Sequence, residues 1–152
     1  MALSASVHLR HTPAHWLVGL APGPSGTYAA ALSTVLFFLI ESALRSGGFF
    51  FFVGTTLLGF FTAGRAEKVY GHDGRAIVVD EVAGQALTLL FVPLTWPWLV
   101  AGFGLFRLFD IVKPWPIGRL EAAPGGVGVM SDDLAAGVMA GVVLALVRLA
   151  FF

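Results

Sequence analysis

A long uncharged stretch between two acidic clusters limits the folds open to this chain. Asp80 and Glu81 precede residues 82–106, which carry no charged side chain, and Asp110 follows shortly after. A single straight helix across a membrane would place the two clusters on opposite faces of the bilayer. The acidic side chains could then share no site.

The prolines in this stretch favour a different arrangement. Pro93 and Pro97 lie near its middle, and proline inside a helix breaks or kinks it. They predict two short helices, at about 82–92 and 97–109, that form a hairpin. Each helix would be under about 20 Å long and too short for a hydrocarbon core of about 30 Å. We therefore expect a re-entrant hairpin, which enters the membrane and returns to the same face. One straight span with unrelated acids at its ends is the alternative, and spacing alone does not decide between them.

The composition indicates an integral membrane protein. Hydrophobic residues make up 57% of the 152 residues and charged residues 12%, against about 25% charged in a soluble domain. The mean hydropathy is +0.86. We predict an all-α membrane helical bundle with one domain over residues 1–152. A net charge of zero gives no indication of nucleic-acid binding, and the absence of cysteine excludes disulfides and thiolate metal sites.

Three further apolar stretches predict membrane helices. They cover residues 28–44, 47–64 and 134–152, and Ser46-Gly47-Gly48 is typical of a turn between the first two. A helix of about 17 residues is about 25 Å long, just enough for a tight span. Residues 1–15 lack the apolar core of a cleavable signal, so we expect insertion through these stretches.

The basic residues predict the orientation in the membrane. Most of them flank the acidic clusters, and cytoplasmic segments carry an excess of Lys and Arg. We therefore expect the acidic clusters on the cytoplasmic face. The flanking basic residues are Arg65, Lys68, Arg75, Arg107, Lys113 and Arg119.

Five carboxylates form the candidate site. They lie in three clusters: Asp80-Glu81, Asp110 and Asp132-Asp133. Burial of a carboxylate costs several kcal/mol unless a cation or a hydrogen-bond donor compensates it, and hard divalent cations prefer carboxylate oxygens. The five side chains therefore predict a metal site. Taken alone, the first cluster could instead be ordinary charge at a helix N-terminus. With metal ligation, Gly84 would leave the helix face open to a substrate or a second helix.

The second cluster adds cations to the acids. Arg107, Asp110 and Lys113 are spaced i, i+3 and i+6, which places them along one stripe of a helix. They could form a salt-bridge ladder, or Asp110 could bind a metal while the two cations hold phosphate oxygens. Pro114 is expected to end this helix.

The third cluster follows a glycine-rich run. Residues 125–133 read Gly-Gly-Val-Gly-Val-Met-Ser-Asp-Asp and lead into the last apolar stretch. Ser131 or Asp132 is expected to cap the helix that follows. An ordinary turn and cap explains one acid better than two adjacent ones.

Together these blocks carry a resemblance to a known family. The blocks are Asp80-Glu81-Val82-Ala83-Gly84-Gln85, Arg107-Leu108-Phe109-Asp110 with Lys113-Pro114-Trp115-Pro116-Ile117, and Gly126, Gly128 and Ser131-Asp132-Asp133. In order and spacing they resemble phosphatidylglycerophosphatase A over roughly residues 16–150. An earlier segment, residues 19–29, keeps the Gly26 and Thr27 of the family pattern but has Ser25 and Ala29 where proline and glycine are usual.

The resemblance implies an Mg²⁺-dependent hydrolase of phospholipid biosynthesis. Such enzymes convert phosphatidylglycerophosphate to phosphatidylglycerol and phosphate at the inner face of bacterial membranes. It implies a multi-pass protein of the bacterial inner (cytoplasmic) membrane, with its active site on the cytoplasmic face. It also makes Thr27 a candidate polar contact to substrate. The preference for this headgroup rests on the resemblance alone.

We therefore expect a metal-assisted phosphomonoester hydrolase. The expected metal ligands and catalytic residues are Asp80, Glu81, Asp110, Asp132 and Asp133, which would hold one or two Mg²⁺. The expected substrate-binding residues are Arg107, Lys113 and Thr27. The sequence leaves both water attack and an aspartyl-phosphate intermediate open. The alternatives are a small cation transporter or channel, because carboxylates in membranes often line ion paths, and a non-catalytic assembly protein.

Overall fold

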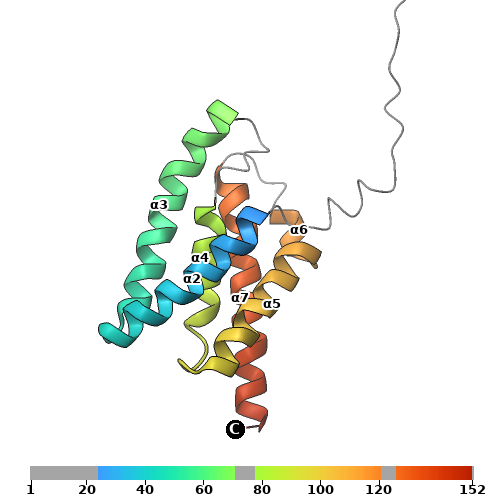
Figure 1. Cartoon of the computed structure of the whole chain (residues 1–152). Helices are drawn as coiled ribbons and strands as arrows, with labels where there is room; N and C mark the ends of the chain where they lie inside the picture. Colours follow the sequence, from blue (N-terminus) through green and yellow to red (C-terminus); the bar gives the residue numbers. More distant parts are fainter. Residues whose placement is uncertain (1–23, 71–77, 121–125, 152) are drawn as a thin grey trace, which may run out of the picture.

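Helices are the only regular secondary structure in the described part of the chain. A computed structural model describes residues 24–70, 78–120 and 126–151, with no strand among them. The helices are α2 (Pro24–Ala43), α3 (Gly47–Tyr70), α4 (Val79–Leu89), α5 (Trp96–Val112), α6 (Ile117–Leu120) and α7 (Gly126–Phe151). Figure 1 shows α3 and α5 on opposite sides of the bundle, with α4 and α7 between them and α2 crossing in front of α4. The all-α prediction is confirmed.

The predicted break in the long uncharged stretch is present. α4 ends at Leu89 and α5 begins at Trp96, so one straight helix through residues 82–106 is wrong. Pro97 lies in the first turn of α5, where its missing N–H costs nothing. α5 runs to Val112, three residues beyond the predicted end, and α4 and α5 form a hairpin (Figure 1). Whether this hairpin is re-entrant stays a prediction.

Two helices meet the length and hydropathy that a membrane crossing requires. They are Gly26–Ala43 of α2 and Met130–Phe151 of α7, while the apolar part of α3, Gly47–Thr62, is shorter. The predicted turn between α2 and α3 is also present. Ser46 has a φ of 72° there, and the Glu41 carboxylate accepts a 2.7 Å hydrogen bond from Gly48 N.

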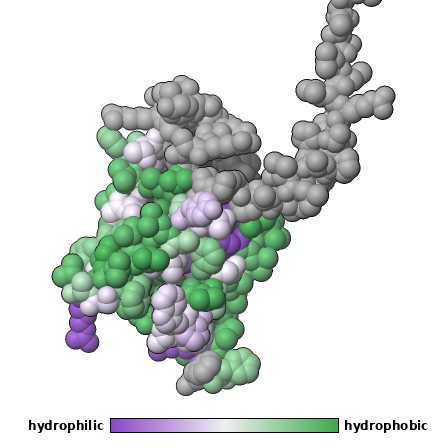
Figure 2. Space-filling model, viewed as in Figure 1, coloured by the Kyte–Doolittle hydropathy of each residue, from purple (hydrophilic) through white to green (hydrophobic). Residues whose placement is uncertain are grey.

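The outer surface is largely apolar, as Figure 2 shows for one face. Large hydrophobic side chains are exposed on several helices, including Tyr28 (73%), Trp115 (75%) and Leu149 (82%). So much exposed apolar surface is unfavourable in water and is typical of a protein that lies in lipid. These features indicate membrane association.

Close backbone packing joins α4 to α7. A Cβ atom added at Gly84 would lie 2.5 Å from Asp133 O and 2.7 Å from Phe106 Cε2. A Cβ added at Gly137 would collide with the carbonyl oxygen of Gly84. Small residues allow helix backbones to approach closely in this way. The open face predicted at Gly84 is therefore occupied by a second helix, α7.

Polar contacts fix α2 against α4. Ser33 Oγ donates a 2.9 Å hydrogen bond to Val82 O, and Gln85 Nε2 donates a 3.1 Å hydrogen bond to Thr34 Oγ1. Ser33 and Gln85 are fully buried, where such bonds have little competition from water. They set the register of the two helices and place the middle of α2 against the first two turns of α4.

Candidate functional site

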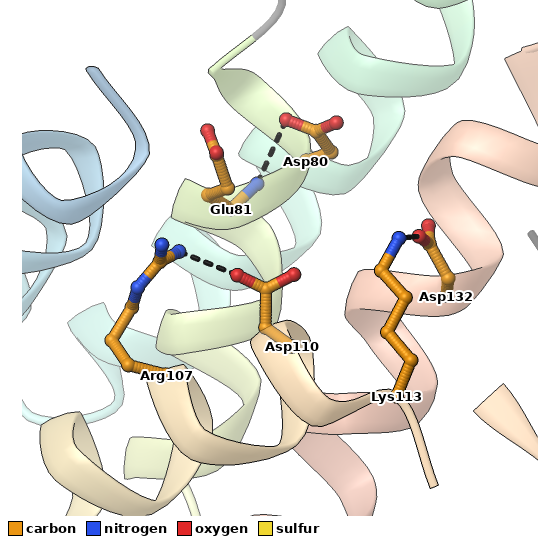
Figure 3. Close-up of polar contacts among 6 residues, drawn as sticks. All are labelled: Asp80, Glu81, Arg107, Asp110, Lys113 and Asp132. Atoms are coloured by element: carbon orange, nitrogen blue, oxygen red, sulfur yellow. Dashed lines mark hydrogen bonds and ion pairs between the residues drawn. The ribbon is translucent and has the colours of Figure 1, made fainter. Parts of the chain in front are cut away.

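The three acidic clusters meet at one end of the bundle. Asp80 and Glu81 lie in the first turn of α4, Asp110 lies in the last turn of α5, and Asp132 and Asp133 lie near the start of α7. Figure 3 shows the side chains of Asp80, Glu81, Asp110 and Asp132 gathered around one region. The hairpin causes this, because it returns the end of α5 to the start of α4.

The carboxylates are unusually buried for charged groups. Asp80, Asp132 and Asp133 are 8%, 6% and 4% exposed, and the Asp110 side chain is 14% exposed. Asp80 Oδ1 accepts a 2.9 Å hydrogen bond from Glu81 N, as an acid at a helix start can. That interaction uses one oxygen atom of the five acids, so helix-terminal charge does not explain the cluster.

The third cluster does not cap a helix. α7 begins at Gly126, so Ser131 and Asp132 lie inside it, and the predicted cap is wrong. Glycine disfavours helix in isolation, but tertiary packing holds this segment. Met130 is fully buried beside Ala83 of α4, and its side chain fills the space left by Gly59 of α3.

Two cations contact the carboxylates. Arg107 Nη1 lies 2.5 Å from Asp110 Oδ2, the expected i, i+3 pair. Lys113 Nζ lies 2.8 Å from Asp132 Oδ2 on α7. Lys113 is thus not the third member of a stripe on α5, and that prediction is wrong. It is the C-cap of α5 with a φ of 46°, because the helical conformation is disfavoured before Pro114. The expected end of the helix at this proline is confirmed.

The local electrostatics resist full ionisation of the first cluster. Burial raises the pKa of Asp80 from 3.8 to about 7. The hydrogen bond from the Glu81 backbone lowers this pKa, and the charges of Asp132 and Asp110 raise it further. Burial also raises the pKa of Glu81 from 4.5 to about 8, with Asp80 and Asp110 adding to the rise and Arg107 opposing it. The first cluster therefore tends to hold protons near neutral pH when no cation compensates its charge.

The residues fit a divalent metal in donor type and in charge. Asp132 and Asp133 are adjacent and both buried, and carboxyl groups buried together need a proton or a cation to compensate their charge. Glu81 Oε2 is buried without a hydrogen-bond partner in the described structure, and every acidic donor is a hard oxygen. Among the described residues, however, no three acids already surround one point in a metal-binding geometry. Metal binding would need their side chains to turn.

The N-terminus of α2 forms one wall of the site. A Cβ atom added at Gly26 would collide with Glu81 Oε1 and would lie 3.4 Å from Arg107 Nη1. Thr27, the predicted substrate contact, is half-buried in the first turn of α2. Sequence reasoning kept Gly26 as a family match but gave it no role. Gly26 has no side chain and precedes the predicted substrate contact Thr27, and this was the signal in the sequence that could have assigned it to the site.

Gln85 is a second residue to which sequence reasoning gave no role. It lies one helical turn after Glu81 and is fully buried. Its Oε1 atom has no hydrogen-bond partner in the described structure. A glutamine in so apolar a stretch was the signal in the sequence that could have drawn attention to Gln85. The sequence could not identify its partner Thr34, because that residue lies on α2, far away along the chain.

Comparison with known proteins identifies the family. The sequence profile described as Phosphatidylglycerophosphatase A matches residues 14–148. A protein of Haemophilus influenzae named Phosphatidylglycerophosphatase A is 36% identical over 130 residues, which cover 83% of this chain and 80% of the relative. A protein of the same name from Escherichia coli is 40% identical over 90 residues, covering 57% of this chain and 52% of the relative.

A third relative carries another name. A Bacteroides thetaiotaomicron protein named "Putative phosphatidylinositol-3-phosphatase" is 40% identical over 133 residues, which cover 84% of each chain. No solved structure matches the chain. The matched range includes all three acidic clusters and both cations. The chain belongs to the phosphatidylglycerophosphatase A family.

Proposed function

We propose that this chain hydrolyses the phosphomonoester of phosphatidylglycerophosphate, releasing phosphatidylglycerol and phosphate. The observation that carries the proposal is the meeting of the three acidic clusters with Arg107 and Lys113 at one end of the bundle. A profile named for this activity covers the same residues. A metal-dependent phosphatase needs oxygen ligands for the metal and cations for the phosphate oxygens, and this end of the bundle supplies both kinds of side chain.

The proposed roles follow from donor type and position. Asp80, Glu81, Asp110, Asp132 and Asp133 would hold Mg²⁺, which when bound neutralises phosphate charge and favours attack by water. Arg107 and Lys113 would stabilise charge on the transferring phosphoryl group, and Thr27 would donate a hydrogen bond to it.

An Asp carboxylate could instead attack phosphorus directly. The P–O bond to the glycerol would then break, the glycerol oxygen would leave as the hydroxyl of phosphatidylglycerol, and water would release phosphate from the aspartyl phosphate.

The substrate would approach from the lipid. Trp115 is 75% exposed directly after the ion-pairing segment of α5, and exposed Trp is typical of the membrane interface. We infer that the site lies at headgroup depth, beside a re-entrant α4–α5 hairpin, with the acyl chains left in the bilayer. The described cations near the site exceed those at the opposite end, where Arg45 and Arg148 lie. This distribution supports a site on the cytoplasmic face, and the inner-membrane location is proposed from the family.

A second lipid phosphomonoester has specific support. The Bacteroides relative is named for phosphatidylinositol 3-phosphate, and the chemistry of the site fits any phosphomonoester. An ion-transport function has no such support. The acids lie at helix ends beside cations rather than along a path through the bundle.

The test is phosphate release by the purified full chain in detergent. Phosphatidylglycerophosphate and phosphatidylinositol 3-phosphate are compared, each with Mg²⁺ and with excess EDTA. We expect release from the first substrate that requires Mg²⁺. Preference for the second would reassign the headgroup, and no release from either by folded protein would refute the phosphatase proposal.

A further inference from the structure

The two cations of the site are engaged with its carboxylates. Arg107 contacts Asp110 within α5, and Lys113 connects the end of α5 to Asp132 of α7. Asp110 and Asp132 are two of the residues proposed to hold the metal. The same cations are proposed to hold the phosphate. In this arrangement one oxygen of Asp110 and one of Asp132 face a cation rather than a metal, and each cation directs a donor at a carboxylate rather than at phosphate.

The positions of the cations allow a change of partner. The Lys113 side chain is 27% exposed while that of Asp132 is 8% exposed, so the lysine can turn toward solvent or a headgroup while the aspartate stays inside. The Arg107 side chain is 8% exposed, and its Nε has no hydrogen-bond partner among the described residues. Its Nη1 also lies next to Gly26, where the first turn of α2 presents backbone N–H groups.

We propose that Arg107 and Lys113 exchange partners when the site is loaded. In the metal-free protein they compensate Asp110 and Asp132. When those carboxylates turn to a divalent metal, the two cations are released to the substrate phosphate, with Arg107 meeting it beside Gly26. This inference rests on the proposed function, because it assumes that metal and phosphate share the site.

The exchange has a thermodynamic consequence. A cation that must leave a carboxylate opposes metal binding, and a cation that gains a phosphate favours it. Metal and phosphate should therefore strengthen each other's binding, and linkage requires the effect to be reciprocal. Removing Lys113 should tighten metal binding alone and weaken the coupling between the two ligands. A lysine that merely stabilises the fold would do neither.

The experiment measures Mn²⁺ binding to the full chain in detergent micelles, by the electron paramagnetic resonance of free Mn²⁺. Kd is measured with and without inorganic phosphate for the unmodified protein, Lys113→Gln and Arg119→Gln. Arg119 is an exposed cation on α6 and controls for the loss of one positive charge at this end. Arg107→Gln repeats the test on the other ion pair, so the result does not depend on one variant folding.

We expect phosphate to tighten Mn²⁺ binding by about tenfold in the unmodified protein and in Arg119→Gln. In Lys113→Gln we expect tighter Mn²⁺ binding without phosphate and a coupling below about threefold. Weaker Mn²⁺ binding in Lys113→Gln, or coupling equal to that of the unmodified protein, would overturn the exchange. Hydrolysis of phosphatidylglycerophosphate by the unmodified protein is measured in parallel. Loss of coupling with hydrolysis intact refutes only this inference, whereas coupling without hydrolysis refutes the proposed function.

Discussion

The contact between α4 and α7 gives the sharpest prediction, for the variant Gly84→Ala. The added Cβ atom would lie 2.5 Å from Asp133 O and 2.7 Å from Phe106 Cε2, whereas ordinary contacts begin at 3.4 Å. The helices would have to separate by about 1 Å, since the Asp133 oxygen is backbone and cannot rotate away. Overpacking of this kind costs about 1–3 kcal/mol of stability. A displacement of about 1 Å at catalytic groups can cost about 10²-fold in rate.

The assay compares kcat for phosphate release with the thermal unfolding midpoint. We expect Gly84→Ala to stay folded at the assay temperature and to lose about 10²-fold in kcat. Gly104→Ala is the matched control, because a Cβ at Gly104 in α5 meets nothing within 4 Å. Alanine there should hold or raise stability by up to about 1 kcal/mol and leave kcat unchanged. If both variants behave alike, close packing of α4 on α7 does not position the acids.

Three further predictions concern the site and its support. Asp110→Asn should lower kcat by at least about 10²-fold with an unchanged helical circular dichroism spectrum, and near-normal activity would remove Asp110 from the proposed ligands. Burial raises the pKa values of Asp80 and Glu81 to about 7 and about 8, so the folded metal-free protein binds more protons than the unfolded chain. Its stability in EDTA should therefore be highest near pH 4 and fall as pH rises toward 8. Stabilisation by Mg²⁺ should grow over the same pH range. A larger effect of Mg²⁺ on the unfolding midpoint at pH 5 than at pH 8 would contradict this prediction. Gln85→Leu should change the free energy of unfolding by less than about 1 kcal/mol in chemical denaturation, because the lost bond to Thr34 is offset by removal of a buried oxygen without a partner; a loss of several kcal/mol would show that this bond holds α2 in place.

Local rules were enough to predict the helices and the hairpin. Proline restricts the backbone wherever it stands, so Pro93 and Pro97 predicted the break between α4 and α5. Hydropathy predicted α2 and α7 as long apolar helices, because hydropathy is also a local property that depends on each segment alone. The order and spacing of the acidic clusters were enough to predict the family.

The contacts between distant segments were decided by the tertiary structure. The start of α7 at Gly126 depends on the packing of Met130 against α3 and α4, and no local pattern contains those neighbours. The partner of Lys113 lies on α7 because Pro114 turns the chain out of the stripe on α5. The sequence by itself thus determined the apolar helical segments, the break between α4 and α5 and which acids are available. Only the packed bundle decided which cation meets which carboxylate, because such pairs depend on distances between helices that the chain does not connect locally.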